Sequence, residues 1–298
     1  MESMKELALR AEEAINSAQE CRRENVNQVA ALAELQRVIT EFEAVQGAYE
    51  GDKPLYYSFA NPLEMHIYYL LYQPTGQEIS QLFIPAAALY REKAALLRSA
   101  SCLPEARRSL MTARRWNPVS PHIALDYAEL MKELGETEEY IRLLRELHPL
   151  IYSGNCLARY YNGFAYYFVG KEMWPEAVCC YFKSLQFNAD AENEVEVVCG
   201  LTEIQHKHGI DFKTPSVKQL DACIKECHLP VRGDEKTAKE LFALGKAMQQ
   251  KEPTGKLAYA ACVAAWEISL EREIREFINT CWPAEKPRPK AEVPVYRV

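Results

Sequence analysis

Apolar residues recur every three or four positions along most of the chain, which is the period of an amphipathic helix. In the first 50 residues a polar stretch at 22–25 interrupts this period, so the pattern predicts either two long helices or one kinked helix. Turn-forming Pro and Gly residues then surround a helical block at 63–72 and two short extended stretches, at 55–59 and 79–84. From residue 85 onward the prolines stand between the periodic segments. The pattern therefore predicts an all-α chain.

Two stretches of the chain carry similar residues at seven equivalently spaced positions. The pairs, each 71 residues apart, are Tyr90 and Tyr161, Ala94 and Ala165, Leu97 and Phe168, Ala106 and Ala177, Leu110 and Tyr181, Ala113 and Ser184, and Pro118 and Ala189. A partial copy between them, from Ala124 to Leu147, divides the 71 residues into 34 and 37. Repetition at this period predicts that each unit is a pair of helices, with small residues where the two helices cross.

This spacing resembles the tetratricopeptide repeat (TPR), a 34-residue pair of helices. The resemblance is closest over 87–190 and is partial over 191–282, where Leu241, Leu244 and Gly245 match the first half of the pattern. It is absent before residue 85. The resemblance implies a right-handed solenoid of helical hairpins whose first helices line a concave groove. Proteins of this family mostly bind on that face, so it also implies a non-enzymatic scaffold or adaptor that binds a protein or peptide.

The predicted organisation is a graded array without a linker between domains. Its parts are an N-terminal helical segment or cap at 1–50, a connector with a short helix at 51–85, TPR-like repeats at 86–190, degenerate helical repeats at 191–282 and an extended tail at 283–298. Within the degenerate part we expect helices at about 192–208 and 215–227. The apolar stretch 293–298 is extended because of its proline, so it is expected either to dock in a groove of its own or a neighbouring copy, or to remain solvated.

The repeat register also predicts which side chains line the groove. A position one residue after a packing position is rotated by about 100° toward the face that the second helix leaves uncovered. The groove residues selected in this way are Arg91, Ala95 and Arg98, then Leu125, Glu129 and Lys132, then Asn162, Tyr166 and Val169, with His122 and Arg159 at the starts of their helices. This mixture of cations, an amide and an aromatic ring suits an extended peptide that carries acidic groups beside an apolar side chain.

The charge of the chain limits a first alternative, binding of nucleic acid. The 298 residues include 35 basic and 42 acidic ones, a net charge of −7 that does not give the broad positive field of a nucleic-acid-binding protein. Residues 85–118 nevertheless contain seven basic and two acidic residues. The arginine stripe in this segment consists of Arg107, Arg108, Arg114 and Arg115, and its plainer interpretation is a solvated helix face. We therefore expect no nucleic-acid partner.

The cysteines and histidines raise a second alternative, a metal-binding protein or an enzyme. Cys223 and Cys227 share a face of one predicted helix, His228 follows them, and His206 and His208 lie on the helix before. Paired Cys-x-x-Cys knuckles, phosphate-binding loops, nucleophile elbows and zinc-protease motifs are absent from the sequence. We expect neither a cofactor nor catalytic residues, and we interpret the ten scattered cysteines as mostly reduced core residues.

The remaining expectation concerns location. No uncharged stretch approaches the ~18 residues that cross a bilayer, and the amino end is charged rather than a signal peptide. The sequence therefore predicts a soluble, cytoplasmic protein without a membrane partner. It does not identify the bound protein or the oligomeric state.

Overall fold

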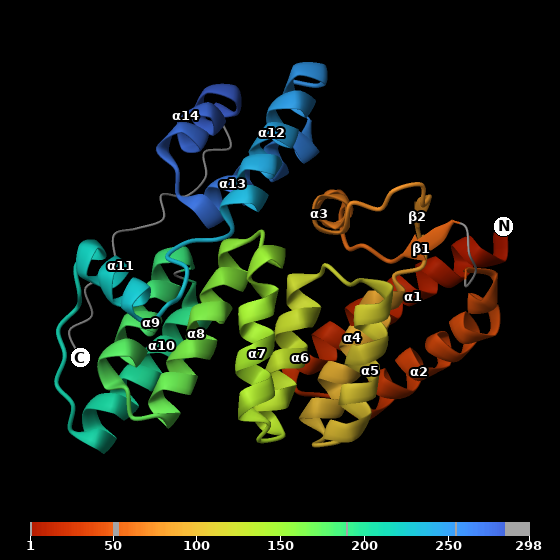
Figure 1. Ribbon diagram of the computed structural model, residues 1–298. Coiled ribbons are helices and arrows are strands. Elements are labelled where there is room, and N and C mark those ends of the chain that lie inside the picture. The colour runs from red at the N-terminus through yellow and green to blue at the C-terminus, as the bar shows by residue number, and fades with distance from the viewer. Residues whose placement is uncertain (1, 50–53, 189, 254, 284–298) are drawn as a thin grey trace. The chain divides into compact units, whose positions relative to one another are not determined.

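The computed structural model describes residues 2–49, 54–188, 190–253 and 255–283 (Figure 1). The described part contains fourteen α-helices: α1 (Glu2–Glu24), α2 (Gln28–Val45), α3 (Pro62–Tyr72), α4 (Ala86–Ser99), α5 (Leu103–Trp116), α6 (Pro121–Glu133), α7 (Thr137–Leu147), α8 (Gly154–Gly170), α9 (Trp174–Phe187), α10 (Ala191–Thr202), α11 (Val217–Glu226), α12 (Glu235–Lys251), α13 (Lys256–Ser269) and α14 (Arg272–Cys281). Short 3₁₀ turns η1 (Gln46–Tyr49) and η2 (His148–Leu150) and a π-helical turn η3 (Glu203–Lys207) accompany them. The predicted all-α class is confirmed.

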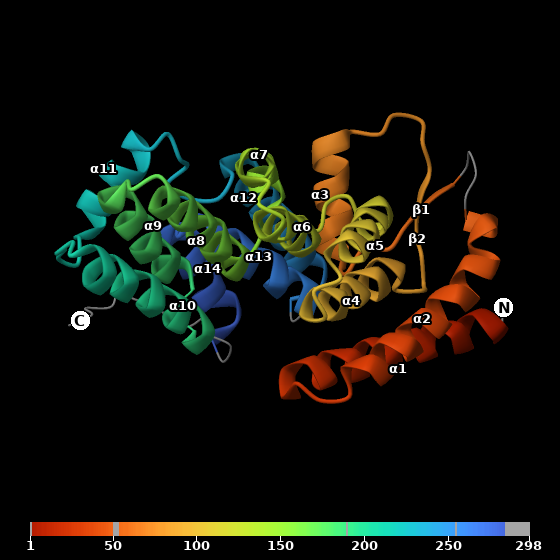
Figure 2. The same cartoon turned by 90° about the horizontal axis from the view of Figure 1, so that it is seen from below.

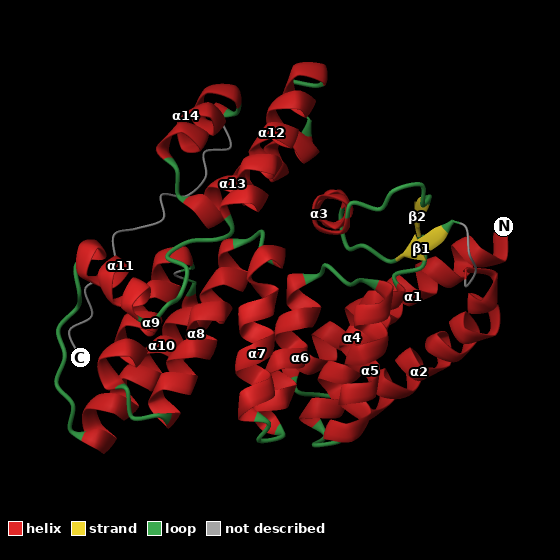
Figure 3. Cartoon of the chain, in the orientation of Figure 1, coloured by secondary structure: helices red, strands yellow, loops and turns green. Residues whose placement is uncertain are grey.

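The described strands are β1 (Leu55–Tyr57) and β2 (Ile79–Gln81), which pair in parallel with Leu55 opposite Ile79 (Figure 3). They fall inside the two extended stretches that the sequence predicts. The helical block between them forms α3, because Asn61 caps its first turn by accepting hydrogen bonds from the Leu63 and Glu64 amides. Residues 54–85 therefore contain one short helix flanked by two short strands. The predicted tail lies outside the described residues from 284 onward.

The chain divides into two compact units, residues 1–136 and 137–298, each of which is described by itself. This division lies inside the segment 86–190 that the repeat pattern delimits. In the first unit α1 and α2 run side by side and both contact α4 (Figures 1 and 2). The first 50 residues therefore form two helices rather than one kinked helix. The buried carboxylate of Glu92 on α4 accepts hydrogen bonds from Gln19 and Arg22, and so fastens α1 to α4.

A second buried carboxylate fastens the connector. Glu64 on α3 is fully buried and accepts hydrogen bonds from the Ala60 amide at 2.6 Å and from the Asn117 side chain at 2.7 Å. Asn117 directly follows α5, so these bonds join α3 to the end of that helix. A buried charged group is stable only when it is paired or hydrogen-bonded, and these contacts meet that condition.

Small residues lie at the crossings of three helical hairpins, α4–α5, α8–α9 and α12–α13. Ala94 and Ala106 in the first and Ala165 and Ala177 in the second are fully buried. In α12–α13 the helices are so close that a Cβ on Gly245 would collide with the Sγ of Cys262. The other matched positions are buried too, apart from Pro118, which is half-buried, and Ala189, which lies outside the described residues: Tyr90, Leu97, Leu110, Ala113, Tyr161, Phe168, Tyr181 and Ser184. The packing therefore follows the register that the repeated sequence pattern predicts.

The same turn follows α4, α6 and α8, and turns of this kind at Asn25 and His228 also follow α1 and α11. Ser101, Gly135 and Glu172 adopt left-handed backbone conformations, with φ of 59°, 77° and 59°, and they are 34 and 37 residues apart. In each turn the next amide donates to the carbonyl five residues earlier: Cys102 to Leu97, Glu136 to Met131 and Met173 to Phe168, at 2.8, 2.9 and 2.9 Å. This is the Schellman motif, which satisfies the last carbonyls of a helix. The spacing of the turns after α4, α6 and α8 equals that of the sequence repeat.

In the second unit the predicted helices at 192–208 and 215–227 correspond to α10 with η3 and to α11. The π-helical turn is a feature that the hydrophobic period does not show. α10 packs so closely on α9 that a Cβ on Gly200 would collide with the ring of Tyr181. A Ser216–Gln219 capping box begins α11.

Candidate functional site

In the first unit, the predicted groove residues Arg91 and Arg98 on α4 form ion pairs with α6. Arg91 donates to Asp126 at 2.6 Å, and Arg98 lies 2.5 Å from Glu133 and 3.6 Å from Glu129. Arg91–Asp126 and Arg98–Glu133 both join residues 35 positions apart, so α4 and α6 contact each other in a regular register. We call these contacts the α4–α6 ion pairs.

The ion pairs change the charge that this surface presents. Burial alone would lower the pKa of Arg98, but its hydrogen bond to Glu133 and the charges of Glu129 and Glu133 outweigh burial and raise it. Arg98 therefore stays protonated with acidic partners beside it. The surface is a mixed one, in which arginine charge is largely balanced by α6.

The other predicted residues of the first unit lie on α6. His122, Glu129 and Lys132 are half-buried. Leu125 was expected on the uncovered face, and this expectation is corrected because its side chain is only 1% exposed. At this position, a side chain rotated by 100° from the packing position still points into the packed interior.

In the second unit, the predicted residues lie on α8. Tyr166 is 49% exposed, and its ring meets the ring of Tyr140 on α7 edge-on, with 6.2 Å between centroids. Arg159 is half-buried and lies seven residues before Tyr166, which places both on one helix face. This face therefore carries an exposed aromatic ring and, two turns before it on the same helix, a cation.

Asn162 requires a correction. It was expected in the groove, but it is buried, and its side-chain amide donates to the Asn193 oxygen on α10 at 2.8 Å. Asn193 in turn donates to the Asn188 carbonyl and to the Ser184 hydroxyl. Asn162 therefore holds α8 against α10, because α10 covers a side of α8 that the repeat pattern leaves open.

The arginine stripe on α5 has partners within the first unit. Arg107 pairs with Glu136 at 3.0 Å and Arg108 with Glu105 at 2.9 Å. Arg114 lies over the ring of Tyr127 and Arg115 over that of Trp116, at 4.9 and 5.9 Å from the centroids. Two of the four charges are thus balanced by carboxylates, and the other two stack on aromatic rings.

The cysteines of the second alternative lie beside other thiols. Cys179 on α9 is hydrogen-bonded to Cys223 on α11, and burial raises the pKa of Cys227 to about 12, with neighbouring Cys223 and Glu176 adding to the effect. A raised pKa keeps a thiol protonated and lowers its nucleophilicity. His208 stacks on Trp174 with 4.3 Å between centroids. Within the described ranges, no three His, Cys, Asp or Glu side chains are grouped so that they could hold a metal ion.

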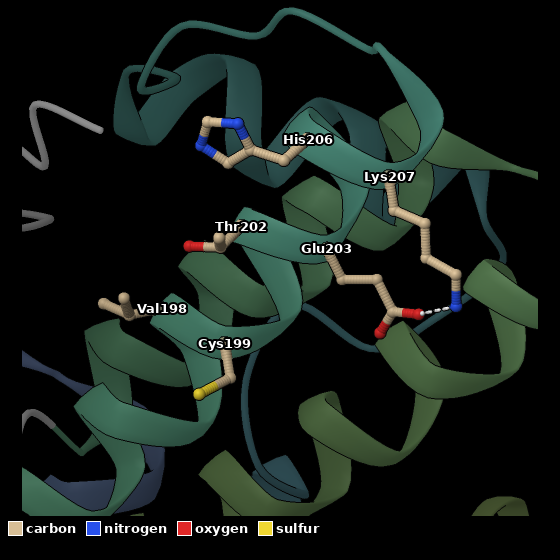
Figure 4. Close-up of a pocket in the computed structure, with 6 residues that line it drawn as sticks. All are labelled: Val198, Cys199, Thr202, Glu203, His206 and Lys207. Atoms are coloured by element: carbon tan, nitrogen blue, oxygen red, sulfur yellow. Dashed lines mark hydrogen bonds and ion pairs between the residues drawn. The ribbon is translucent and has the colours of Figure 1, made fainter.

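An open cavity on α10 and η3 is a feature that the sequence analysis missed. It has a volume of about 420 Å³, and its described lining residues are Val198, Cys199, Thr202, Glu203, His206 and Lys207 (Figure 4). Val198, Cys199, Thr202 and His206 project from one side of the helix, and Glu203 and Lys207 form an ion pair at 2.9 Å on the adjacent side. The available signal was a second apolar stripe on α10, opposite the stripe that packs on α8 and α9.

Comparison of the chain with family models, with curated proteins and with solved structures finds no match. Among the described helices, none has both the length and the apolar character that crossing a membrane requires.

Proposed function

We propose that this chain is a non-enzymatic scaffold or adaptor that binds a protein or peptide, built as a right-handed TPR-like solenoid with α1 and α2 as its cap. The observation that carries the proposal is the recurrence of one Schellman turn at Ser101, Gly135 and Glu172, in register with the buried alanines of the hairpins. A backbone that repeats together with its packing residues is typical of stacked helical hairpins. Such arrays bind along exposed helix faces, while their interiors hold them together.

The α4–α6 ion pairs support this interpretation. In a stack of hairpins, equivalent helices of successive units lie beside each other, so contacts between them join residues about one repeat apart. Arg91–Asp126 and Arg98–Glu133 each span 35 residues. His122 and Lys132 on α6 are half-buried, as is Glu129, a partner of Arg98.

The proposed binding surface consists of faces on the first helices. Each unit carries its own face: in the second unit Arg159 and Tyr166 on α8, and in the first unit Arg91, Arg98, His122, Glu129 and Lys132 on α4 and α6. An exposed tyrosine supplies a large contact area at little entropic cost, which makes Tyr166 the expected anchor for an apolar side chain of the partner. We propose a cytoplasmic location, because the ten cysteines, all of them among the described residues, are free thiols.

Site-specific photocrosslinking tests this function. A photoreactive phenylalanine analogue replaces Tyr166 in the full chain, and a matched variant carries it at Met111, which is 55% exposed on α5. In cells, the Tyr166 position should form one or a few discrete protein adducts, because that face binds a partner. The Met111 position should form none of them.

Three outcomes would contradict the proposal. Adducts from Met111 alone would move binding to the face of α5. Adducts with nucleic acid would favour the arginine stripe as the functional surface, and loss of those adducts with rising salt would identify its charges as the cause. Absence of adducts from both positions would remove the scaffold function.

A further inference from the structure

The outer face of α10 and η3 is apolar and exposed. We define it by Val195, Val198, Cys199, Thr202 and His206, whose spacing places them on one side of the helix. Val195 is 63% and Val198 38% exposed, whereas Val197, Leu201 and Ile204 on the opposite side are fully buried. The cavity of about 420 Å³ opens on the second half of this face (Figure 4). A helix with apolar residues on both sides commonly has a second partner.

An acidic edge runs beside the first half of the outer face. Glu192 and Glu196 are both exposed and lie four residues apart, about 60–100° round the helix from Val195. Along α10 the acidic edge therefore comes first and the cavity second. An occupant of this face should carry positive charge followed by apolar side chains.

The segment 284–298 has this composition in this order. Lys286, Arg288 and Lys290 come first, followed by Val293-Pro294-Val295-Tyr296. In an extended chain, residues two apart lie about 6–7 Å from each other, which matches the rise of about 6 Å between Glu192 and Glu196. The charges and the apolar residues of the segment are thus complementary to the outer face of α10.

The segment follows α14, which belongs to the same unit as α10. When extended, the chain spans up to about 10–23 Å from residue 283 to the three basic residues and up to about 33 Å to residue 293. Because the segment is tethered, its effective concentration at the face is of the order of 1 mM, so an intrinsic dissociation constant of about 0.1 mM is enough for about 90% occupancy.

We propose that residues 286–298 bind the outer face of α10 in the same chain. The basic residues lie along Glu192 and Glu196, and Val295 and Tyr296 enter the cavity at Val198, Thr202 and His206. Three prolines in the segment, Pro287, Pro289 and Pro294, favour the extended form and lower the entropy lost on docking. This inference is independent of the surface proposed above for partner binding.

Cys199 provides the test, because it lies in the middle of the outer face and its side chain is exposed. The measured quantity is the rate of alkylation by N-ethylmaleimide in the full chain, followed by peptide mass spectrometry. The variant is Val295→Asp with Tyr296→Asp, which changes no residue of the described fold. Occupancy of about 90% predicts that Cys199 reacts about tenfold faster in the variant. Cys102, which is exposed in the other unit, serves as an internal reference with an unchanged rate.

Two further measurements define the occupant. Addition of a synthetic peptide of residues 284–298 at about 1 mM should restore slow alkylation of Cys199 in the variant. Glu192→Lys with Glu196→Lys should accelerate alkylation more in the otherwise wild-type chain than in the Val295→Asp, Tyr296→Asp variant, because only a bound segment loses its charge complementarity, whereas the direct effect of the lysines on the Cys199 thiol is the same in both. Equal Cys199 rates in the wild type and the Val295→Asp, Tyr296→Asp variant would overturn the proposal. Protection that disappears on dilution of the protein would overturn it too, because the occupant would then be a second copy.

Discussion

Single alanines set how closely the paired helices approach. Ala106 and Ala177 are fully buried in the α4–α5 and α8–α9 hairpins. Ala177→Leu and Ala106→Leu should each lower the free energy of unfolding by about 1–3 kcal/mol, because the added methyl groups must displace packed neighbours. Urea or thermal unfolding measures the change.

Arg114→Ala is the control for these two variants. Arg114 is exposed on α5, and its contact with the ring of Tyr127 is at the surface. Its removal should change stability by less than about 1 kcal/mol. An unchanged melting temperature for Ala177→Leu together with a lowered one for Arg114→Ala would show that the helices pack in another register.

His148 should make stability depend on pH. Burial lowers its pKa from the ordinary 6.5, and this effect exceeds the opposite ones from the Arg232 carbonyl, 2.9 Å from Nε2, and from Asp234. The neutral form is therefore favoured in the folded state, whereas the unfolded chain takes up the proton near pH 6.5. Stability is complete above that pH and falls as the pH decreases toward the lowered pKa of the folded state.

The measurement is urea unfolding of the wild type and of His148→Gln, which keeps a donor for the Arg232 carbonyl. The difference in unfolding free energy between the two proteins should change between about pH 7.5 and about pH 5.5, with the wild type losing more stability. Parallel pH profiles would mean that His148 titrates alike in the folded and unfolded chain.

At the scale of elements, the α4–α6 ion pairs hold two helices in register. Arg91 and Asp126 have side chains that are 29% and 13% exposed, so the pair is screened less than one at the surface. A double-mutant cycle with Arg91→Ala and Asp126→Ala should give a coupling energy of about 1 kcal/mol. Added salt should reduce it only partly.

The control cycle uses Arg142 and Glu146, an exposed pair within α7. Its coupling energy should be about 0.3–0.5 kcal/mol and should decrease strongly with salt. Equal coupling in both cycles would mean that the α4–α6 contacts add no more than a pair within one helix.

The sequence predicts most of the elements for identifiable reasons. Pro104, Pro121 and Pro175 stand in the first turns of α5, α6 and α9, where a missing amide is tolerated, so these helix starts were predictable. The hydrogen bond that holds α3 against the end of α5 was not predictable, because Glu64 and Asn117 are 53 residues apart and no local sequence pattern links them. The π-helical turn escapes prediction as well, since one extra residue in a turn barely alters the hydrophobic period.

At the scale of the whole molecule, partner binding should depend on the first-helix faces. Arg159→Ala and Tyr166→Ala should each weaken binding of the crosslinked partner about tenfold or more, as loss of an anchor does. Arg91→Ala should weaken binding too, and it should also destabilise the first unit because it leaves Asp126 without its 2.6 Å contact. Affinity measurements combined with unfolding curves separate the two effects.

The variants Arg107→Glu and Arg114→Glu provide the comparison on α5. They should leave partner affinity unchanged. Binding that survives Arg91→Ala, Arg159→Ala and Tyr166→Ala together, but is lost with the two α5 variants, would place the site on the arginine stripe.

The candidate site was predictable only in part. A repeat pattern gives the direction of each side chain on its own helix, which correctly leaves Tyr166 exposed. It does not tell which further helices cover that direction, and for this reason Leu125 and Asn162 were placed on the surface although they are buried. The cavity on α10 was missed because its described lining residues belong to α10 and η3 and carry no motif.

Two of the Schellman turns after α4, α6 and α8 hold a residue other than glycine in a left-handed conformation, so substitutions there can raise the thermal stability of the chain. Gly135 occupies the left-handed position of one turn at no steric penalty, whereas Ser101 and Glu172 hold the same conformation with φ of 59°. A side chain there costs roughly 1–2 kcal/mol, and part of this is offset by the greater freedom of glycine in the unfolded chain. Ser101→Gly and Glu172→Gly should each raise the melting temperature by about 2–4 °C in calorimetry. A lineage facing higher temperature could therefore gain heat tolerance at two turns without changing a helix.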